Sequence, residues 1–236
     1  MQRLVFVHGS VGNGEAAWGK QRPLRNEFEL VVLNRPGFPP GPPVDRVDFE
    51  EHATWVAERL RPGDHVCGHS YGGVVSLYAA AQVEGLASLT VAEPPAFGIA
   101  AGRPGVDEFS AKLESLWTDG PGEPRAFLAA FYATVAGRDV ELPELLPPDL
   151  LQGARTLMVE RGPWEARPPL DELRMEPFPK LVVSGGWNAA FEAVCDVLEE
   201  RLPAQRAVLQ GMGHNPQLLG RPFNDALRAF LLSAGS

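Results

Sequence analysis

The stretch Cys67-Gly68-His69-Ser70-Tyr71-Gly72-Gly73 decides the fold of this chain. A short strand-like run over residues 65–67 precedes it, and small and apolar residues at helical spacing follow it over residues 74–81. This succession predicts a strand, a sharp turn and a helix, with Ser70 at the turn and its hydroxyl pointing out of the sheet. Gly68 and Gly72 agree with such a turn, because side chains at these two positions would collide with the neighbouring strand and helix. The amide groups at the start of the helix would point at the same spot.

Length and composition indicate an ordinary globular protein. The chain has 236 residues, of which 44% are hydrophobic and 22% charged, which suits one domain, with or without an inserted subdomain. The formal net charge is −9 and no Lys/Arg-rich run occurs, so we expect no nucleic-acid partner and no anionic membrane partner. We find neither an apolar run long enough to span a membrane nor a signal peptide. Cys67 and Cys195 lie in apolar segments, so we expect buried free thiols, without zinc-site spacing, in a cytoplasmic protein.

Short apolar runs alternate with helical patterns at both ends of the chain. We expect strands at residues 4–7, 30–33, 65–67, 86–92, 181–184 and 206–209, and helices at 15–24, 49–60, 190–202 and 223–232. Six strands that alternate with helices predict an α/β fold with a mostly parallel, six-stranded, doubly wound sheet.

Residues 97–178 have a different character. They are rich in proline and glycine, and no strand-like run interrupts them. Apolar residues at helical spacing predict three helices, at 106–117, 124–135 and 149–161. We therefore expect a core formed by residues 1–96 and 179–236, with a helical insertion at 97–178.

Polar and glycine-rich signals follow the ends of the predicted strands, where sites lie in sheets of this kind. A serine hydroxyl needs a base to become nucleophilic, and the usual base is histidine. His214 follows the last predicted strand, lies between glycines and is free to reach Ser70. The other histidines are placed on a helix, at the opposite edge, within the sharp turn or before a glycine loop. By elimination, His214 is the predicted base.

Acyl transfer also needs N–H donors for the oxyanion that develops. One predicted donor is the amide of Tyr71, the residue after the serine. The other should come from the loop that begins His8-Gly9, from the amide of Ser10 or alternatively from that of Val11.

A third group must hold the far nitrogen of the imidazole of His214. Glu93 ends the fourth predicted strand at the required edge and precedes two prolines. Asn188 follows the fifth predicted strand and could orient the ring without carrying charge. Glu93 is the predicted acid of the triad, and Asn188 is the alternative that would orient the ring of His214. A further possibility is that Glu93 instead caps the insertion or pairs with a cation such as Arg35.

His8-Gly9, Gly68-His69-Ser70-Tyr71-Gly72-Gly73 and Gly213-His214 resemble the α/β-hydrolase superfamily over nearly the whole chain. The resemblance implies that residues 97–178 form the lid of that fold, and that the first two strands of the fuller fold are missing. Two positions depart from the pattern, because Asn34 stands where Asp is common and Asn188 where the acid is usual. Some members look similar in taking their acid from the strand that carries Glu93 here.

The predicted function is hydrolysis of a small or medium-sized ester, thioester or lactone through an acyl-enzyme on Ser70. We expect no metal and no organic cofactor, a small-molecule substrate, and a monomer or homodimer. The alternatives are a C–C bond hydrolase or cofactor-free lyase or cyclase on the same fold, or a non-catalytic ligand-binding relative. Bulky residues of the insertion are the expected pocket lining. These are Phe97, Leu113, Trp117, Phe127, Phe131, Tyr132 and Met158.

Overall fold

A parallel sheet forms the centre of the molecule. The computed structural model describes residues 1–136 and 140–234, and in this part of the chain six parallel strands form one sheet in the order β2-β1-β3-β4-β5-β6. The sequence prediction of a six-stranded parallel sheet is confirmed. The strands are β1 (Arg3–Val7), β2 (Glu29–Leu33), β3 (His65–His69), β4 (Ser88–Ala92), β5 (Lys180–Ser184) and β6 (Gln205–Val208).

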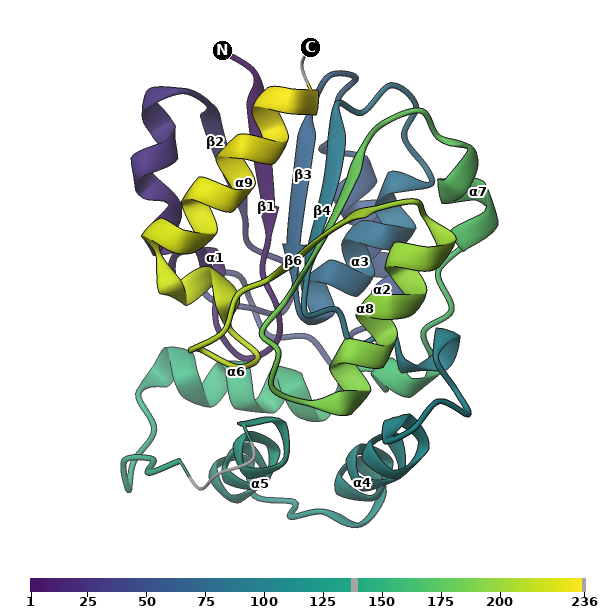
Figure 1. Ribbon diagram of the computed structural model, residues 1–236. Helices are drawn as coiled ribbons and strands as arrows, with labels where there is room; N and C mark the ends of the chain where they lie inside the picture. The colour runs from purple at the N-terminus through teal and green to yellow at the C-terminus, as the bar shows by residue number, and fades with distance from the viewer. Residues whose placement is uncertain (137–139, 235–236) are drawn as a thin grey trace.

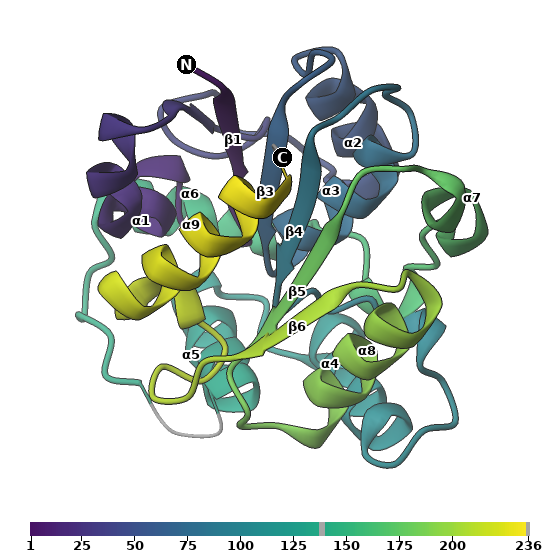
Figure 2. The same cartoon turned by 45° about the horizontal axis from the view of Figure 1, so that its top comes forward.

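Helices cover both faces of the sheet, as a doubly wound fold requires. Figures 1 and 2 show α1 (Gly14–Trp18) and α9 (Arg221–Ala234) on one face. The opposite face carries α2 (Phe49–Ala57), α3 (Tyr71–Ala80) and α8 (Ala189–Arg201). Each face packs its own cluster of buried apolar side chains. The small residues of α3 let this helix pack tightly, and nearly its whole length is buried.

Between β4 and β5 the chain leaves the sheet and forms a group of helices. Figure 1 places α4 (Val106–Asp119), α5 (Pro124–Ala136) and α6 (Pro148–Met158) beyond the carboxyl ends of the strands. A short α7 (Leu170–Met175) leads back to β5. An apolar cluster joins these helices to the core through Val11. None of the helices in the described part of the chain is long and apolar enough to cross a membrane.

The structure corrects two details of the sequence prediction. The helix expected at 15–24 ends at Trp18 and continues as a 3-10 helix, η1 (Gly19–Asn26), which contains Pro23. The helix expected at 149–161 ends at Met158, because Glu160 forms an isolated parallel bridge with Val47. Three further 3-10 helices are η2 (Phe97–Ile99), η3 (Pro163–Glu165) and η4 (Pro216–Leu219).

Candidate active site

Ser70 lies at a strained turn between β3 and α3. Its φ is 53° and its ψ −131°, a conformation that side chains rarely adopt. The close packing around the turn explains its glycines. A Cβ on Gly68 would lie 2.3 Å from the side-chain oxygen of Ser76, and a Cβ on Gly72 would lie 2.2 Å from the carbonyl oxygen of His8. The turn predicted from the sequence therefore places the serine at the carboxyl edge of the sheet.

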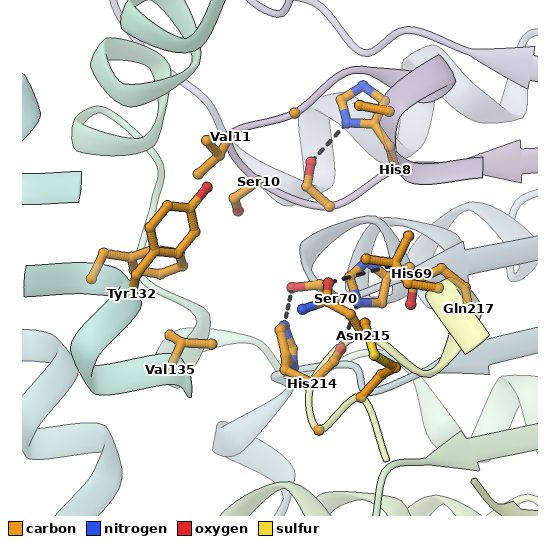
Figure 3. A pocket seen from close by; sticks show the side chains of 18 of the residues that line it. His8, Ser10, Val11, His69, Ser70, Tyr132, Val135, His214, Asn215 and Gln217 are labelled. Atoms are coloured by element: carbon orange, nitrogen blue, oxygen red, sulfur yellow. Dashed lines mark hydrogen bonds between the residues drawn. The ribbon is translucent and has the colours of Figure 1, made fainter. Parts of the chain in front are cut away.

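His214 lies in the loop after β6 and faces Ser70 (Figure 3). Its Nε2 is 2.8 Å from Ser70 Oγ, and its Nδ1 is 3.3 Å from Oε2 of Glu93. The loop is fixed from behind, because the carbonyl oxygen of His214 accepts a hydrogen bond of 2.8 Å from Nε2 of His69. The ring of Phe191 packs beside the imidazole, with 4.6 Å between the ring centroids. The imidazole thus connects a serine on one side with a carboxylate on the other.

Glu93 is fully buried at the end of β4, where its φ is 49°. Its amide donates to the carbonyl of Val183 at 2.9 Å. Its carboxylate accepts hydrogen bonds from the amide of Gly185 at 2.6 Å and from Nε1 of Trp187 at 2.8 Å. With these two donors in place, Oε2 also lies within reach of Nδ1 of His214 and can accept a hydrogen bond from it.

Asn188, the alternative third group, has another role in the structure. Its side-chain oxygen caps the first turn of α8, accepting from the amide of Ala190 at 2.8 Å and from that of Phe191 at 3.4 Å. The loop that the sequence analysis singled out therefore contacts Glu93 through Gly185 and Trp187, and not through Asn188.

The four other histidines are held by different partners. Nδ1 of His8 donates to the carbonyl of Gly9 and its Nε2 accepts from the amide of Arg35. Nδ1 of His52 accepts from the guanidinium of Arg35, and His65 contacts a serine hydroxyl. Burial lowers the pKa of His8 well below its usual value and lowers the pKa of both His52 and His69 to about 3, so all three are neutral at pH 7. His214 is the histidine whose ring contacts the hydroxyl of Ser70.

A buried ion pair, which was not predicted from the sequence, supports the first loop. Arg35 and Glu160 are buried side chains 3.3 Å apart, and the other oxygen of Glu160 accepts from the hydroxyl of Ser10 at 2.5 Å. Burial raises the pKa of Glu160, while the positive charge of Arg35 opposes this rise. Because Arg35 pairs with Glu160, the possible pairing of Arg35 with Glu93 does not occur in this structure. Arg35 lies two residues after the end of β2, at the carboxyl edge of the sheet, but this position alone did not indicate a buried partner.

The backbone of the first loop is held in a defined orientation. The carbonyl of Gly9 accepts from Nδ1 of His8 at 2.7 Å and from Nη2 of Arg35 at 2.8 Å. In a trans peptide the following amide points the opposite way, so these contacts also orient the N–H of Ser10. Val11 has a φ of 70°, in the left-handed region. Across the site, the amide of Tyr71 opens α3, where it has no intrahelical acceptor.

Two cavities meet at Ser70. The larger has a volume of about 650 Å³, and Figure 3 shows Ser10 and Tyr132 on one wall with His214 and Gln217 on the other. The smaller, of about 30 Å³, is lined by Ser70, Tyr71 and His214 together with residues of the helical insertion and of α8. Those further residues include Leu113, Trp117, Phe131, Glu160 and Phe191.

The insertion residues named from the sequence divide into two groups. Leu113, Trp117, Phe131 and Tyr132 line one or both cavities. The remaining three do not line either one: Phe97 packs against Phe109 and Phe191, Phe127 against Trp117, and Met158 against the apolar cluster of the insertion. Size and apolar character alone could not separate these groups, because both kinds of position bury large side chains. Within residues 1–136 and 140–234 no group of three His, Cys, Asp or Glu side chains could hold a metal ion.

The chain belongs to the alpha/beta hydrolase family, whose sequence profile matches residues 4–226. Solved structures with the same fold include a thermophilic esterase from Thermogutta terrifontis (22% identity, TM-score 0.72, covering 100% of this chain and 91% of that one). MenH from S. aureus is similar at 17% identity and a TM-score of 0.72, covering 100% and 95%. Est816, described as an N-acyl homoserine lactone degrading enzyme, is similar at 20% identity and a TM-score of 0.61, covering 98% and 93%. No curated protein matches the chain.

Proposed function

We propose that this protein is a serine hydrolase that cleaves a small or medium-sized ester, thioester or lactone through an acyl-enzyme on Ser70. One observation carries the proposal, namely the continuous contact from Ser70 through His214 to the buried carboxylate of Glu93. A nucleophile, a base and a group that orients the base are the parts that acyl transfer requires. The similar folds of an esterase and of a lactone degrading enzyme support this class of substrate.

In the first half of the reaction, Ser70 Oγ attacks the carbonyl carbon of the substrate and its proton moves to Nε2 of His214. The electrons of the carbonyl double bond move to the oxygen, which the amides of Tyr71 and Ser10 stabilise, with Val11 as the alternative to Ser10. Glu93 accepts a hydrogen bond from Nδ1–H of His214 and stabilises the imidazolium that forms. The tetrahedral intermediate then collapses, and the leaving oxygen or sulfur takes the proton from Nε2.

In the second half, water attacks the acyl-enzyme and gives its proton to His214. The serine oxygen leaves as the ester bond breaks, takes that proton back, and releases the carboxylic acid. Water is the only co-reactant, so the atoms balance without a further reagent. The same residues therefore act twice, with His214 changing from base to acid in each half.

We also propose that residues 97–178 act as a lid over a core made of residues 1–96 and 179–236. The four insertion residues that line the cavities support this role.

Cys67 and Cys195 are buried and unpaired, which fits a cytoplasmic protein.

A fluorophosphonate probe tests the proposal, because it reacts with an activated serine. Intact-mass analysis should show one adduct per chain, and Ser70→Ala should abolish it. Ser115→Ala, which changes an exposed serine on α4, is the matched control and should label like the wild type. A panel of esters, thioesters, lactones and 1,3-diketones then separates the chemistries. Turnover of the diketones alone would favour C–C bond hydrolysis, and labelling that persists in Ser70→Ala would exclude this serine as the nucleophile.

A further inference from the structure

The two cavities at Ser70 differ about twentyfold in volume, at about 650 Å³ and about 30 Å³. We propose, on the basis of the proposed function, that the smaller cavity receives the acyl chain and the larger one the leaving group. The enzyme would then select short acyl groups and accept bulky alcohols, thiols or ring substituents.

The direction of each group follows from the reaction. The leaving atom must take its proton from Nε2 of His214, so it lies on the side of the loop after β6. That loop lines the larger cavity through residues 211–215, whereas His214 alone of these residues also lines the smaller cavity. The carbonyl oxygen must face the amides of Tyr71 and Ser10, and the acyl chain takes the remaining direction. Tyr71 and the α4 residues Leu113 and Trp117 line the smaller cavity but not the larger one, so this direction leads into the smaller cavity.

The volume of the smaller cavity limits the chain length. A water molecule needs about 10–15 Å³ of such space, so the cavity has room for about two or three non-hydrogen atoms. Counted beyond the carbonyl carbon, this corresponds to acyl groups of up to about four carbons. An apolar chain suits the cavity, because Leu113, Trp117 and Phe191 line it and the carboxylate of Glu160 is already bound by Arg35 and by the hydroxyl of Ser10.

The walls of the smaller cavity hold one another in place. The indole of Trp117 contacts the rings of Phe131 and Trp164, with centroids 6.0 Å and 5.7 Å apart. Its Nε1 also donates to the carbonyl of Glu160 at 3.0 Å. Leu113 is only 2% exposed. Because packed side chains of this kind yield little, a longer chain would have to displace them, which costs about 1–3 kcal/mol in a packed interior.

The larger cavity has a different chemistry, which suits a polar leaving group. Tyr132, Asn215 and Gln217 bring hydroxyl and amide groups to its lining.

Two substrate series test the assignment on the wild-type protein. One varies the acyl chain from acetyl to octanoyl with p-nitrophenol as the constant leaving group. The other keeps the acetyl group and enlarges the alcohol from methanol to phenol to naphthol. We expect kcat/KM to fall about five- to a hundredfold from the butyryl to the octanoyl ester, because a cost of about 1–3 kcal/mol corresponds to about that range. Within the acetyl series, naphthyl acetate should be cleaved within tenfold of phenyl acetate.

A flat acyl series, or rejection of the bulky alcohol together with acceptance of the octanoyl chain, would overturn the assignment while ester hydrolysis itself continues. Failure of the proposed function has another signature, which is no cleavage in either series and no labelling of Ser70. The two failures are therefore distinguishable.

A pair of variants on one helix locates the effect. Leu113 lines the smaller cavity, whereas Leu116, also buried on α4, lines neither of the two cavities at Ser70. Leu113→Ala should raise the ratio of octanoyl to butyryl turnover at least about fivefold, and Leu116→Ala should leave this ratio unchanged. An equal change in both variants would mean that the helix was loosened in general. If Leu113→Ala does not fold, the wild-type series still decides the question.

Discussion

Replacement of Glu93 by Gln tests the third member of the proposed triad with little change of shape. The carboxylate accepts from three groups: one oxygen from the amide of Gly185, the other from Nε1 of Trp187 and Nδ1 of His214. A glutamine amide has one oxygen that accepts and one NH2 that donates. The amide in Glu93→Gln can therefore accept either from Gly185 or from Trp187 and His214, but not from both sides.

Both orientations of the amide impair the site. If its oxygen faces Gly185, its NH2 faces Nδ1 of His214 and favours the tautomer protonated at Nε2, which cannot accept the proton of Ser70. If its oxygen faces His214, two N–H groups oppose each other at Gly185 and the negative charge is lost. A charge-assisted hydrogen bond contributes about 1.5–3 kcal/mol, which corresponds to about 10- to 150-fold in rate. The loss of the reactive tautomer adds to this, so we expect kcat to fall about a hundredfold or more. The corresponding change in a serine protease costs about 10⁴.

The assay is steady-state hydrolysis of p-nitrophenyl acetate, with thermal unfolding as the check on the fold. Asn188→Ala is the matched control, because it removes the cap of α8 and should cost about 1 kcal/mol of stability but less than about tenfold in kcat. A folded Glu93→Gln protein with kcat within tenfold of the wild type would refute the assignment. A larger loss in Asn188→Ala would move the orienting role to that residue.

Two further predictions concern stability. Gly72→Ala should destabilise the protein by more than about 4 kcal/mol or prevent folding, because the added Cβ would lie 2.2 Å from the carbonyl oxygen of His8. Urea unfolding measures the loss of stability, and a loss below about 1 kcal/mol would contradict the close packing at the turn. His52 and His69 have pKa values lowered to about 3 by burial, whereas unfolded histidine titrates near about 6.5, so the unfolded chain binds more protons between these values. The free energy of unfolding is therefore not reduced by these two residues above about pH 6.5. It falls as the pH drops from about 6.5 toward 3, by up to about 1.4 kcal/mol per pH unit for each residue. Urea unfolding at pH 7, 6 and 5 should show this slope, His52→Gln should flatten it, and equal stability of the wild type at pH 7 and pH 5 would be evidence against neutral buried histidines.

The sequence located the sheet and the edge of the site because both depend on local patterns. Buried parallel strands read as short apolar runs, and parallel strands bring their carboxyl ends to one edge. Ser70, Glu93 and His214 each follow such a run, so their meeting could be predicted without knowledge of the order of the strands. The sharp turn at Ser70 also has a local signature, because its glycines are needed for close packing.

Contacts between distant segments could not be predicted in this way. Arg35 and Glu160 are 125 positions apart, and neither has a neighbouring pattern that indicates a buried pair. Trp187 stands in the expected loop, yet only the folded chain shows that its indole donates to Glu93. Likewise, the helical spacing of α4 does not show that Leu113 faces a cavity while Leu116 faces an apolar cluster. Which of two buried residues faces a cavity depends on how the helices pack against the core, and not on the spacing of apolar residues along the helix.

The most direct test of the account is detection of the acyl-enzyme. Rapid acid quenching during turnover of p-nitrophenyl acetate, followed by intact-mass analysis and peptide mapping, measures whether the acetyl group is bound and where. We expect an acetyl group on the peptide that contains Ser70, and neither acetylation nor turnover with Ser70→Ala. An acetyl group on a different residue, or hydrolysis by Ser70→Ala at the wild-type rate, would contradict it.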